Sequence, residues 1–236
     1  MTEEIFRVEA YEKQCEARVT AVDDAGIHLD RTVFYPMGGG QPGDTGLLRL
    51  QDGSEIPISD TRKDNASGNI VHLPGVGVAA DLVGQQVQAC IDWERRHRLM
   101  RMHTLLHLLC AVIPAGVTGG SIRDGSGRLD FDLPESTLDK EHISAELNRL
   151  IEENHPVSGR WITDDELAAN PELVRTMSVA PPMGSGKVRV LEVQGVDLQP
   201  CGGTHVAATG EIGRVRVRKI EKKGKHNRRV NVEFVD

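Results

Sequence analysis

The sequence pattern changes near residue 90, and this change constrains the fold more than any other feature. Before it, residues 1 to about 90 contain short β-type runs separated by glycine-rich turns. Leu47–Leu50 and Glu55–Ile58 flank Asp52-Gly53, a dipeptide typical of a two-strand hairpin. Many short strands joined by such turns are typical of a small barrel. We therefore predict a small β-barrel over residues 1–90.

Beyond residue 90 the hydrophobic residues follow a helical period. Asp92 can cap a helix that Pro114 ends, with apolar positions three and four residues apart between them. A second helix is expected from about Asp139 to Asn154, and Thr163-Asp164-Asp165-Glu166 is a capping-box sequence that opens a third. Strand-type runs then dominate. These runs are Lys187–Val193, Val196–Gln199, Ile212–Ile220 and Arg229–Val235.

Strand runs beside a few long helices predict an α+β fold class. We expect an N-terminal small β-barrel, residues 1–90, followed by a C-terminal α/β two-layer domain, residues 91–236, with a mainly antiparallel sheet. The chain contains no run of 18 apolar residues, and its start is polar and acidic. We therefore expect neither a membrane-spanning helix nor a secretory signal, and a location in the cytosol.

Basic residues concentrate in one segment of an otherwise acidic chain. Arg214–Arg229 contains nine Lys or Arg and one acid, Glu221, so the segment has a net charge of +8. The net charge of the whole chain is −7, so the rest of the chain carries −15. This distribution suits contact with a polyanion at one place. A solvated strand face is the alternative, and we favour RNA binding because compensating acids are missing locally in the sequence.

Two further features of the sequence bear on RNA binding. Arg95, Arg96, Arg98 and Arg101 form a second basic cluster at the start of the first helix, and we take it as another candidate surface. Aromatic residues make up only 3% of the chain, which argues against platforms that stack single-stranded bases. Contact with the charged backbone of a folded RNA fits the composition better.

His103 and His107 lie four residues apart on the expected first helix, within RMHTLLHLL. This spacing places both imidazoles on one face, one turn apart. Thr104 stands where the H-E-x-x-H pattern of zinc proteases needs its glutamate, so that class is excluded. Two histidines without a shared role are the alternative, but on an apolar helix both need polar partners, and one metal would serve both.

Cys201 and His205 form a second pair with the same spacing, in LQPCGGTHV after a strand. Gly202 and Gly203 give the backbone freedom to turn both side chains toward one atom. One thiolate and three imidazoles make a plausible tetrahedral set for zinc, whereas magnesium and calcium prefer oxygen ligands. The two pairs together predict a metal site.

Phe34–Gly46, FYPMGGGQPGDTG, is too rich in glycine and proline for a regular element. A tight barrel turn would explain it, and so would backbone amides that approach a ligand. A second glycine segment, MGSGK at Met183–Lys187, fails as a phosphate loop. Pro181 stands at the first glycine position of that motif, and Val188 follows the lysine. We treat this segment as a flexible turn and expect no ATP site.

The order of these motifs resembles the editing domain shared by alanyl- and threonyl-tRNA synthetases. The resemblance rests on HTLLH followed far downstream by CGGTH, on the glycine-rich segment, on DWERRHRLMRMHTLLHLL, and on the GRLDFDL strand at Gly127–Leu133. It extends from about Phe34 to Val235. The free-standing members of this family are the AlaX-type editing proteins. No aminoacylation region fits in the remaining residues, so the chain looks like a stand-alone, medium-length member.

The resemblance implies a zinc-dependent aminoacyl-tRNA hydrolase that edits mischarged alanine tRNA in trans. It would remove serine, with glycine as a second candidate, from the 3′ ribose. The implied zinc ligands, which also carry the catalysis, are His103, His107, Cys201 and His205. Substrate contacts are expected from Gly38, Gly39, Gly40, Gln41, Asp44 and Thr104. Contacts with tRNA are expected from Arg218, Lys222, Lys223 and Lys225.

Several alternatives stay open at this level. Four zinc ligands are typical of a structural site, whereas three leave a position for water or for the substrate amine. Zinc could activate the water, or it could only orient the aminoacyl group. The Thr104 hydroxyl could equally bond back to its own helix. A non-catalytic tRNA-binding module with a structural zinc, or a small-molecule zinc hydrolase, would share the motifs. The sequence does not indicate an oligomeric state.

Overall fold

The computed structural model describes residues 2–64, 67–75, 82–134, 138–175 and 186–235. These residues form two compact units, Met1–His97 and Arg98–Asp236. Residues 183–185 of the expected MGSGK turn lie outside the described residues. Within the described ranges, no helix is long and apolar enough to cross a membrane.

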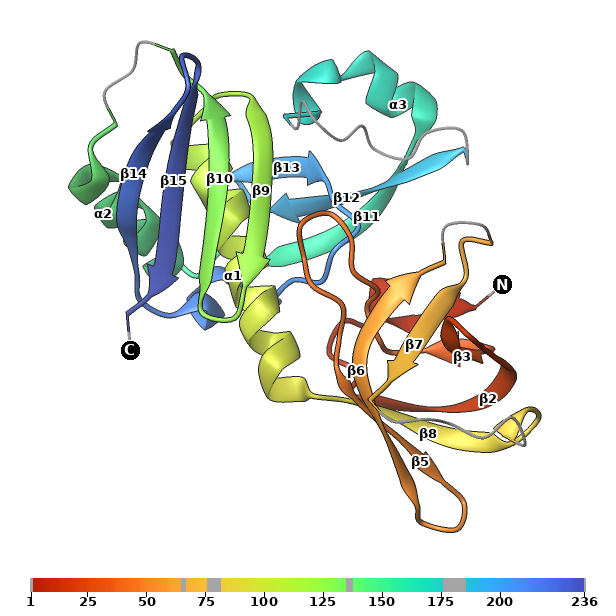
Figure 1. The fold of residues 1–236 in the computed structure, drawn as a ribbon. Coiled ribbons are helices and arrows are strands. Elements are labelled where there is room, and N and C mark those ends of the chain that lie inside the picture. Colours follow the sequence, from red (N-terminus) through yellow and green to blue (C-terminus); the bar gives the residue numbers. More distant parts are fainter. Residues whose placement is uncertain (1, 65–66, 76–81, 135–137, 176–185, 236) are drawn as a thin grey trace. The chain divides into compact units, whose positions relative to one another are not determined.

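Six antiparallel strands of the first unit close into a barrel, as predicted (Figure 1). Around the barrel the strand order is β2, β3, β7, β6, β5 and β8. The predicted Asp-Gly hairpin joins β5 to β6, and Gly53 in its turn has a φ of +85°. A short parallel pair, β1 with β4, and a 3-10 turn, η1, complete the unit. The bounds are β1 Glu3–Glu4, η1 Ile5–Arg7, β2 Gln14–Asp23, β3 Gly26–Leu29, β4 Arg31–Thr32, β5 Gly46–Leu50, β6 Glu55–Lys63, β7 Ile70–Pro74 and β8 Gln86–Ile91.

Alternating side chains fill the barrel interior. On β2, Ala17 and Val19 are buried, whereas Glu16, Arg18 and Thr20 are exposed. Successive side chains of a strand point to opposite faces, so this alternation gives the strand one core face and one solvent face. The main hydrophobic cluster of the unit includes Ile27, Leu29, Leu48, Val87 and Ala89.

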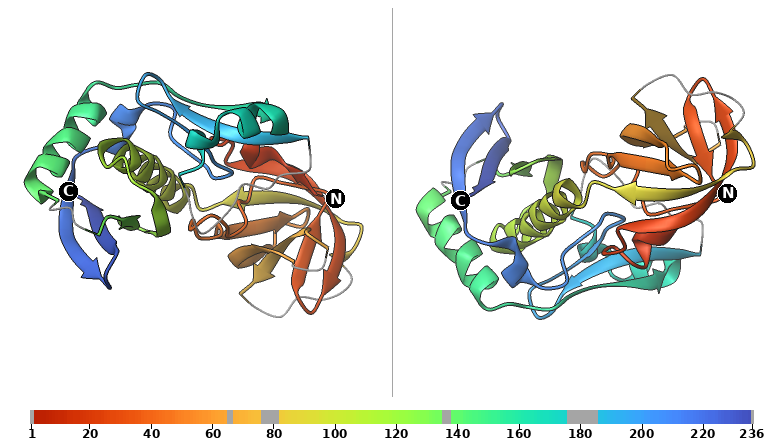
Figure 2. Two further views of the ribbon diagram at one scale, coloured as in Figure 1. Left: turned by 90° about the horizontal axis from the view of Figure 1, so that it is seen from above. Right: turned by 90° about the horizontal axis from the view of Figure 1, so that it is seen from below.

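The second unit contains two antiparallel sheets (Figure 1). One has four strands in the order β14, β15, β10, β9, and the other has three in the order β11, β12, β13. Helices α1 and α2 lie on one side of the four-stranded sheet, which is the predicted two-layer arrangement (Figure 2). The bounds are α1 Trp93–Val112, β9 Val117–Arg123, β10 Ser126–Asp132, α2 Lys140–Glu152, β11 Val157–Thr163, α3 Asp164–Ala169, η3 Pro171–Leu173, β12 Lys187–Val193, β13 Asp197–Pro200, η4 Thr209–Ile212, β14 Val215–Lys223 and β15 Asn227–Phe234.

Close contacts explain how the helices pack on this sheet. A side chain at Gly127 of β10 would place its Cβ 2.8 Å from the sulfur of Met102, so the glycine lets α1 approach the strand. Helix α2 is held by Asn148, whose side-chain amide bonds both the carbonyl and the N–H of Val215 at 2.8 and 3.0 Å. The Asp139 carboxylate caps α2 by accepting two backbone N–H groups, at the position where the sequence predicted the helix to begin.

Two strands of the second unit, β9 and β11, were not expected from the sequence. Strand β9 contains Gly119-Gly120, and glycine weakens a strand signal because it offers no side chain to pack. Strand β11 has four consecutive exposed residues, so the alternation that identifies a half-buried strand is missing. Both strands form through pairing with partners elsewhere in the chain, β9 with β10 and β11 with β12.

His72 is a fully buried histidine in the barrel unit. Its Nδ1 lies 3.1 Å from the carbonyl oxygen of Ile27 and its Nε2 lies 2.8 Å from the hydroxyl of Thr32. A carbonyl can only accept, so Nδ1 carries the proton and Nε2 accepts from Thr32. Burial lowers the pKa of His72 to about 4.

This depressed pKa predicts that acid destabilises the protein. In the unfolded chain the pKa of a histidine is about 6.5, so unfolding takes up a proton at pH values between the two pKa values. The free energy of unfolding should therefore fall by about 3 kcal/mol as the pH decreases from 6.5 to 4. Urea unfolding at several pH values measures this loss. His72→Gln, which cannot titrate, should remove this part of the pH dependence, and identical pH profiles for both proteins would contradict the assignment.

Candidate metal centre

Helix α1 supplies the first pair of candidate ligands. His103 and His107 are both buried, and their ring centroids lie 5.6 Å apart, one helical turn from each other. Neighbouring residues of the helix, Leu105, Leu108 and Leu109, are buried in the core. The helical period therefore directs both imidazoles toward the interior of the second unit, as the sequence predicted.

The second pair lies in the loop that follows β13. The sulfur of Cys201 is 3.1 Å from Nε2 of His205 and 3.6 Å from Nε2 of His103. The Arg189 guanidinium holds the loop, because one of its nitrogens donates to the carbonyls of Cys201 at 2.8 Å and Gly203 at 3.2 Å. The backbone N–H of Cys201 in turn donates to the carbonyl of Arg189 at 3.0 Å.

The two pairs converge, as expected. One ligand atom from each of His103, His107, Cys201 and His205 lies within 4.8 Å of every other. A tetrahedral ion with metal–nitrogen bonds of about 2.0–2.1 Å and a metal–sulfur bond of about 2.3 Å has ligand–ligand edges of roughly 3.3–3.6 Å. The distances of 3.1 and 3.6 Å from the Cys201 sulfur to His205 and His103 lie near these edges. The cluster could therefore hold a metal ion with little rearrangement.

Hydrogen bonds on the far side of the rings fix which nitrogen faces the cluster. The Thr104 hydroxyl donates its one proton to the carbonyl of Met100 at 3.0 Å. In the 3.2 Å contact between this hydroxyl and His205, Nδ1 of His205 must therefore be the donor. That leaves Nε2 of His205 with a free lone pair toward Cys201. A proton on Nδ1 and a lone pair on Nε2 is the tautomer that a metal requires.

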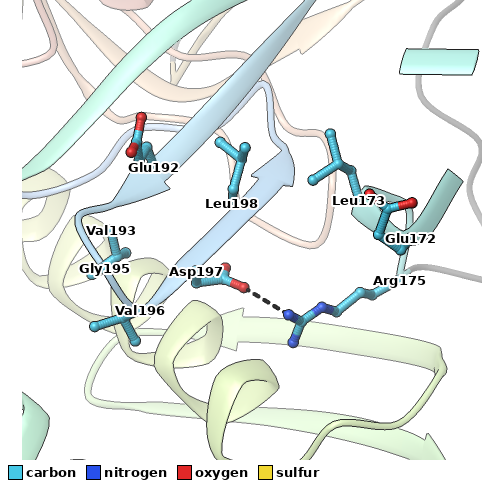
Figure 3. Close-up of a pocket in the computed structure, with 9 residues that line it drawn as sticks. All are labelled: Glu172, Leu173, Arg175, Glu192, Val193, Gly195, Val196, Asp197 and Leu198. Carbon is cyan, nitrogen blue, oxygen red and sulfur yellow. Dashed lines mark ion pairs between the residues drawn. The ribbon is translucent and has the colours of Figure 1, made fainter. Parts of the chain in front are cut away.

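His107 is oriented by a carboxylate instead. Its Nδ1 lies 3.2 Å from Asp197 on β13, and the same carboxylate oxygen accepts from the Gln199 side chain at 2.7 Å. The other oxygen of Asp197 faces Arg175 at 3.3 Å (Figure 3). Asp197, Arg175 and Glu192 line a cavity of about 310 Å³ beside the cluster. The carboxylate thus lies between His107 and this cavity.

The electrostatics of the cluster favour a positive ion. Burial would raise the pKa of Cys201, but the neighbouring His103 outweighs it and holds the pKa well below its usual value. Burial lowers the pKa of His205 to about 3, so this ring is neutral. Burial also acts to lower the pKa of His107, yet the bonds to Asp197 and Cys201 raise it to about 9. The site therefore contains a thiolate and stabilises positive charge beside it, as a metal-binding site does.

The glycine-rich segment belongs to the first unit. Gly38 and Gln41 pair through reciprocal backbone bonds of 3.1 and 2.9 Å, and the two residues between them, Gly39 and Gly40, have φ values of +56° and +82°. Positive φ at both central positions is the pattern of a type I′ turn, which favours glycine. The Gln41 side chain is buried, whereas Gly39 and Gly40 are exposed.

A buried ion pair holds this segment. Asp44 is 1% exposed and Arg96 is not exposed at all, and their side chains bond directly. Asp44 also accepts the backbone N–H of Tyr35 at 2.6 Å, and Arg96 donates to the carbonyl of Val33 at 2.7 Å. The interpretation of Arg95, Arg96, Arg98 and Arg101 as one basic surface is therefore wrong, because Arg96 is buried to pair with a buried carboxylate.

The other arginines of that cluster are also engaged in the structure. Arg95 donates to the carbonyl of Gly43 at 2.8 Å, and Arg98 pairs with Asp124. Arg101 donates to the carbonyl of Ile212 and lies 4.2 Å from the ring centroid of Phe234. Their helical positions give no sign of these partners, which come from distant segments.

The basic segment lies on β14 and the turn to β15, and Arg216 and Arg218 are both exposed. Acids do lie beside these cations, contrary to the expectation that they are missing locally. Glu233 of β15 lies 2.6 Å from Arg216 and 3.8 Å from Arg218, and Glu221 lies 3.1 Å from Lys219 and 3.4 Å from Lys223. Within the described ranges Lys222 and Lys225 have no ion pair.

Sequence reasoning missed Asp197 and Arg189. A signal for Asp197 existed, because Asp197 and Gln199 alternate along β13 and so share a face, and Cys201 follows at the same two-residue spacing. Arg189 carried no such signal, since its contact with the Cys201 loop depends on the pairing of β12 with β13.

Comparison with known proteins adds independent findings. Residues 188–231 match the family described as threonyl and alanyl tRNA synthetase second additional domain, and residues 2–95 match tRNA synthetases class II (A). The chain is 37% identical to the alanyl-tRNA editing protein AlaX-M of Methanosarcina acetivorans and 40% identical to that of Methanosarcina barkeri, over the full length of both chains in each case. It is 33% identical to the alanine–tRNA ligase of Pyrobaculum neutrophilum, with 94% of this chain matching 25% of the ligase.

The geometry of Asp197 predicts a defined loss of metal affinity. Asp197→Asn keeps the shape of the side chain but removes the charge that orients His107. Loss of such a partner weakens metal binding by about 10- to 100-fold. Competition with a chromogenic chelator measures the affinity without any assay of activity. Glu192→Gln is the matched control, since it removes a charge at the same cavity without touching a ligand. Equal chelator resistance of wild type and Asp197→Asn would refute this role.

Proposed function

Because this chain belongs to the AlaX-type alanyl-tRNA editing proteins, we propose that it is a zinc-dependent hydrolase that removes serine from mischarged alanine tRNA, with glycine as a second substrate. The observation that carries the proposal is the convergence of His103, His107, Cys201 and His205 in one buried cluster. The substrate is made during translation, which places the proposed activity in the cytosol.

The donor set supports zinc as the ion. Three imidazole nitrogens and one thiolate are soft or borderline ligands, which zinc accepts and magnesium or calcium does not. Asp197 and Thr104 hold the outward nitrogens of His107 and His205, which is how histidines that bind a metal are usually oriented. A zinc ion bound here would supply a Lewis acid for the ester carbonyl and would lower the pKa of a bound water toward about 7.

The chain's own groups would position the reacting ester. Hydrolysis adds water to the ester carbonyl, breaks its bond to the ribose oxygen and returns a proton to that oxygen. His103, His107, Cys201 and His205 would hold the ion at that carbonyl. The buried setting of His103 and His107 would limit bulk water around the ester, which strengthens electrostatic contacts.

The glycine turn is proposed to contact the substrate. Within the described part of the chain, the backbone N–H groups of Gly39 and Gly40 have no hydrogen-bond partner, and both residues are exposed. Such groups can donate to an oxygen of the aminoacyl group or of the terminal nucleoside. Gly38 and Gln41 close the turn, and Asp44 supports it through Arg96. Thr104 would act on the substrate indirectly, by holding His205.

The proposed partner is tRNA, which would bind the exposed cations of β14 and of the turn between β14 and β15. Arg218, Lys222, Lys223 and Lys225 would contact phosphates of the backbone. Lys222 and Lys225, which have no ion pair among the described residues, are the strongest candidates. A non-catalytic module with a structural zinc is the second candidate, because four ligands are typical of a closed structural site.

The catalytic proposal predicts loss of deacylation when the ligands are removed. Cys201→Ala combined with His205→Ala should abolish release of serine from alanine tRNA that has been charged with serine, and should also abolish zinc binding. Radiolabelled serine release and metal analysis measure the two effects. Turnover at the wild-type rate by the double variant would end the proposal. Stoichiometric zinc with tRNA binding but no hydrolysis in wild type would favour the non-catalytic module, and activity on a free serine ester unaffected by tRNA would favour a small-molecule hydrolase.

The tRNA proposal predicts a salt-dependent loss of affinity. Lys222→Ala/Lys223→Ala/Lys225→Ala should weaken tRNA binding at low salt and reduce the slope of log affinity against log salt by roughly 0.7–0.9 for each phosphate that these lysines neutralise. Zinc content should stay unchanged. Lys140→Ala/Arg149→Ala/Arg160→Ala removes the same charge from exposed positions elsewhere in the unit and is the control. Unchanged affinity of the first variant at low salt would exclude these lysines.

A further inference from the structure

Trp161, one of the two tryptophans of the chain, lies exposed on β11. Its exposed fraction is 47%, although tryptophan is ordinarily well buried. Its neighbour Ile162 points to the other face of the strand and packs in a small core with Leu167, Val188 and Val190. Trp161 therefore adds nothing to that core, and it leaves a large aromatic surface open to a ligand.

The strand register places Trp161 on the face that carries the metal centre. Trp161 pairs directly with Arg189 of β12, and directly paired residues present their side chains on one face. Arg189 in turn lies beside Cys201, since the backbone N–H of Cys201 donates to the carbonyl of Arg189. Cys201, Arg189 and Trp161 thus form one row across the three-stranded sheet.

Arg189 connects the two ends of this row. One of its guanidinium nitrogens holds the carbonyls of Cys201 and Gly203, as described above. The same guanidinium extends over Gly159 of β11, where a Cβ would come within 2.7 Å of it. Gly159 therefore leaves room for a planar cation between the metal ligands and Trp161.

A second cation lies at the ring itself. The ammonium of Lys187 is 5.0 Å from the Trp161 ring centroid, a cation–π contact on one face of the indole. An aromatic ring has two faces, and the 47% exposure of Trp161 leaves surface available for another planar group. An indole with two cations beside it matches the chemistry of a nucleotide, which combines a planar base with a phosphate.

We propose that Trp161 stacks on the base of the 3′-terminal nucleoside of the substrate tRNA, with Lys187 beside the adjoining phosphate. This proposal rests on the proposed function, because it assumes that the ester lies at the metal centre. Neighbouring strands are about 4.7–4.9 Å apart, so two spacings place Trp161 roughly 10 Å from Cys201 across the sheet. One nucleoside, with its ester at the metal, can bridge that span.

The first experiment compares steady-state deacylation of seryl-tRNA by wild type and by Trp161→Ala. Loss of one stacked base weakens binding by about 5- to 150-fold, so KM should rise within that range while kcat and zinc content stay unchanged. Trp161→Phe keeps an aromatic face and should recover most of the affinity. Arg160→Ala, on the adjacent residue and the opposite face, should leave KM unchanged. An unchanged KM for Trp161→Ala, with active wild type, overturns the stacking proposal alone.

The second experiment does not depend on catalysis. In a Trp93→Phe background, Trp161 is the sole tryptophan, and uncharged alanine tRNA should quench its fluorescence. The same tRNA without its terminal adenosine should not quench it. Equal quenching by both tRNAs overturns the stacking proposal even if hydrolysis is intact. Selective quenching by the full-length tRNA together with absence of hydrolysis would support the stacking and refute the proposed activity.

Discussion

The contact between α1 and β13 is the constraint on which the second unit depends. It brings two histidines of a helix against a thiolate and a third histidine from a loop almost 100 residues later. Without further partners, three buried imidazoles and a thiolate would oppose folding, because each must lose its water. Asp197, Thr104 and Arg189 supply those partners, so the same hydrogen bonds that make burial tolerable also orient the ligand atoms inward.

Much of this centre could be predicted from the sequence, because its parts follow local rules. The four-residue spacing of His103 and His107 needs only a helical period, just as the Thr163 capping box elsewhere in the unit needs only local hydrogen bonds. Even so, spacing alone indicated the four residues of the cluster and not the groups that orient them. The partner of His107 is Asp197 on β13, and the partner of His205 is Thr104 on α1. Only the folded chain shows which nitrogen each ring presents.

The remaining differences arise where tertiary contacts override composition. Arg96 was expected on a surface, but Asp44 draws it into the barrel unit as half of a buried ion pair. The basic strand seemed to lack acids because Glu233 is distant in sequence, yet it lies on the neighbouring strand. The low aromatic content argues against a platform that stacks many bases, and this stays a prediction, since the proposed contact needs only one indole and one base. Trp161 acquires its significance from the register of β11 with β12.

The pairing of the basic strand has a consequence for how long a bound polyanion would stay. Glu233 is shared by Arg216 and Arg218, and Glu221 by Lys219 and Lys223, so each carboxylate serves two cations. At these four cations an arriving phosphate would have to displace a resident carboxylate. Such an exchange yields a small net free energy for each phosphate bound, and lifetimes of complexes follow mainly from the dissociation rate. Brief residence would suit a protein that inspects many correctly charged molecules for each faulty one.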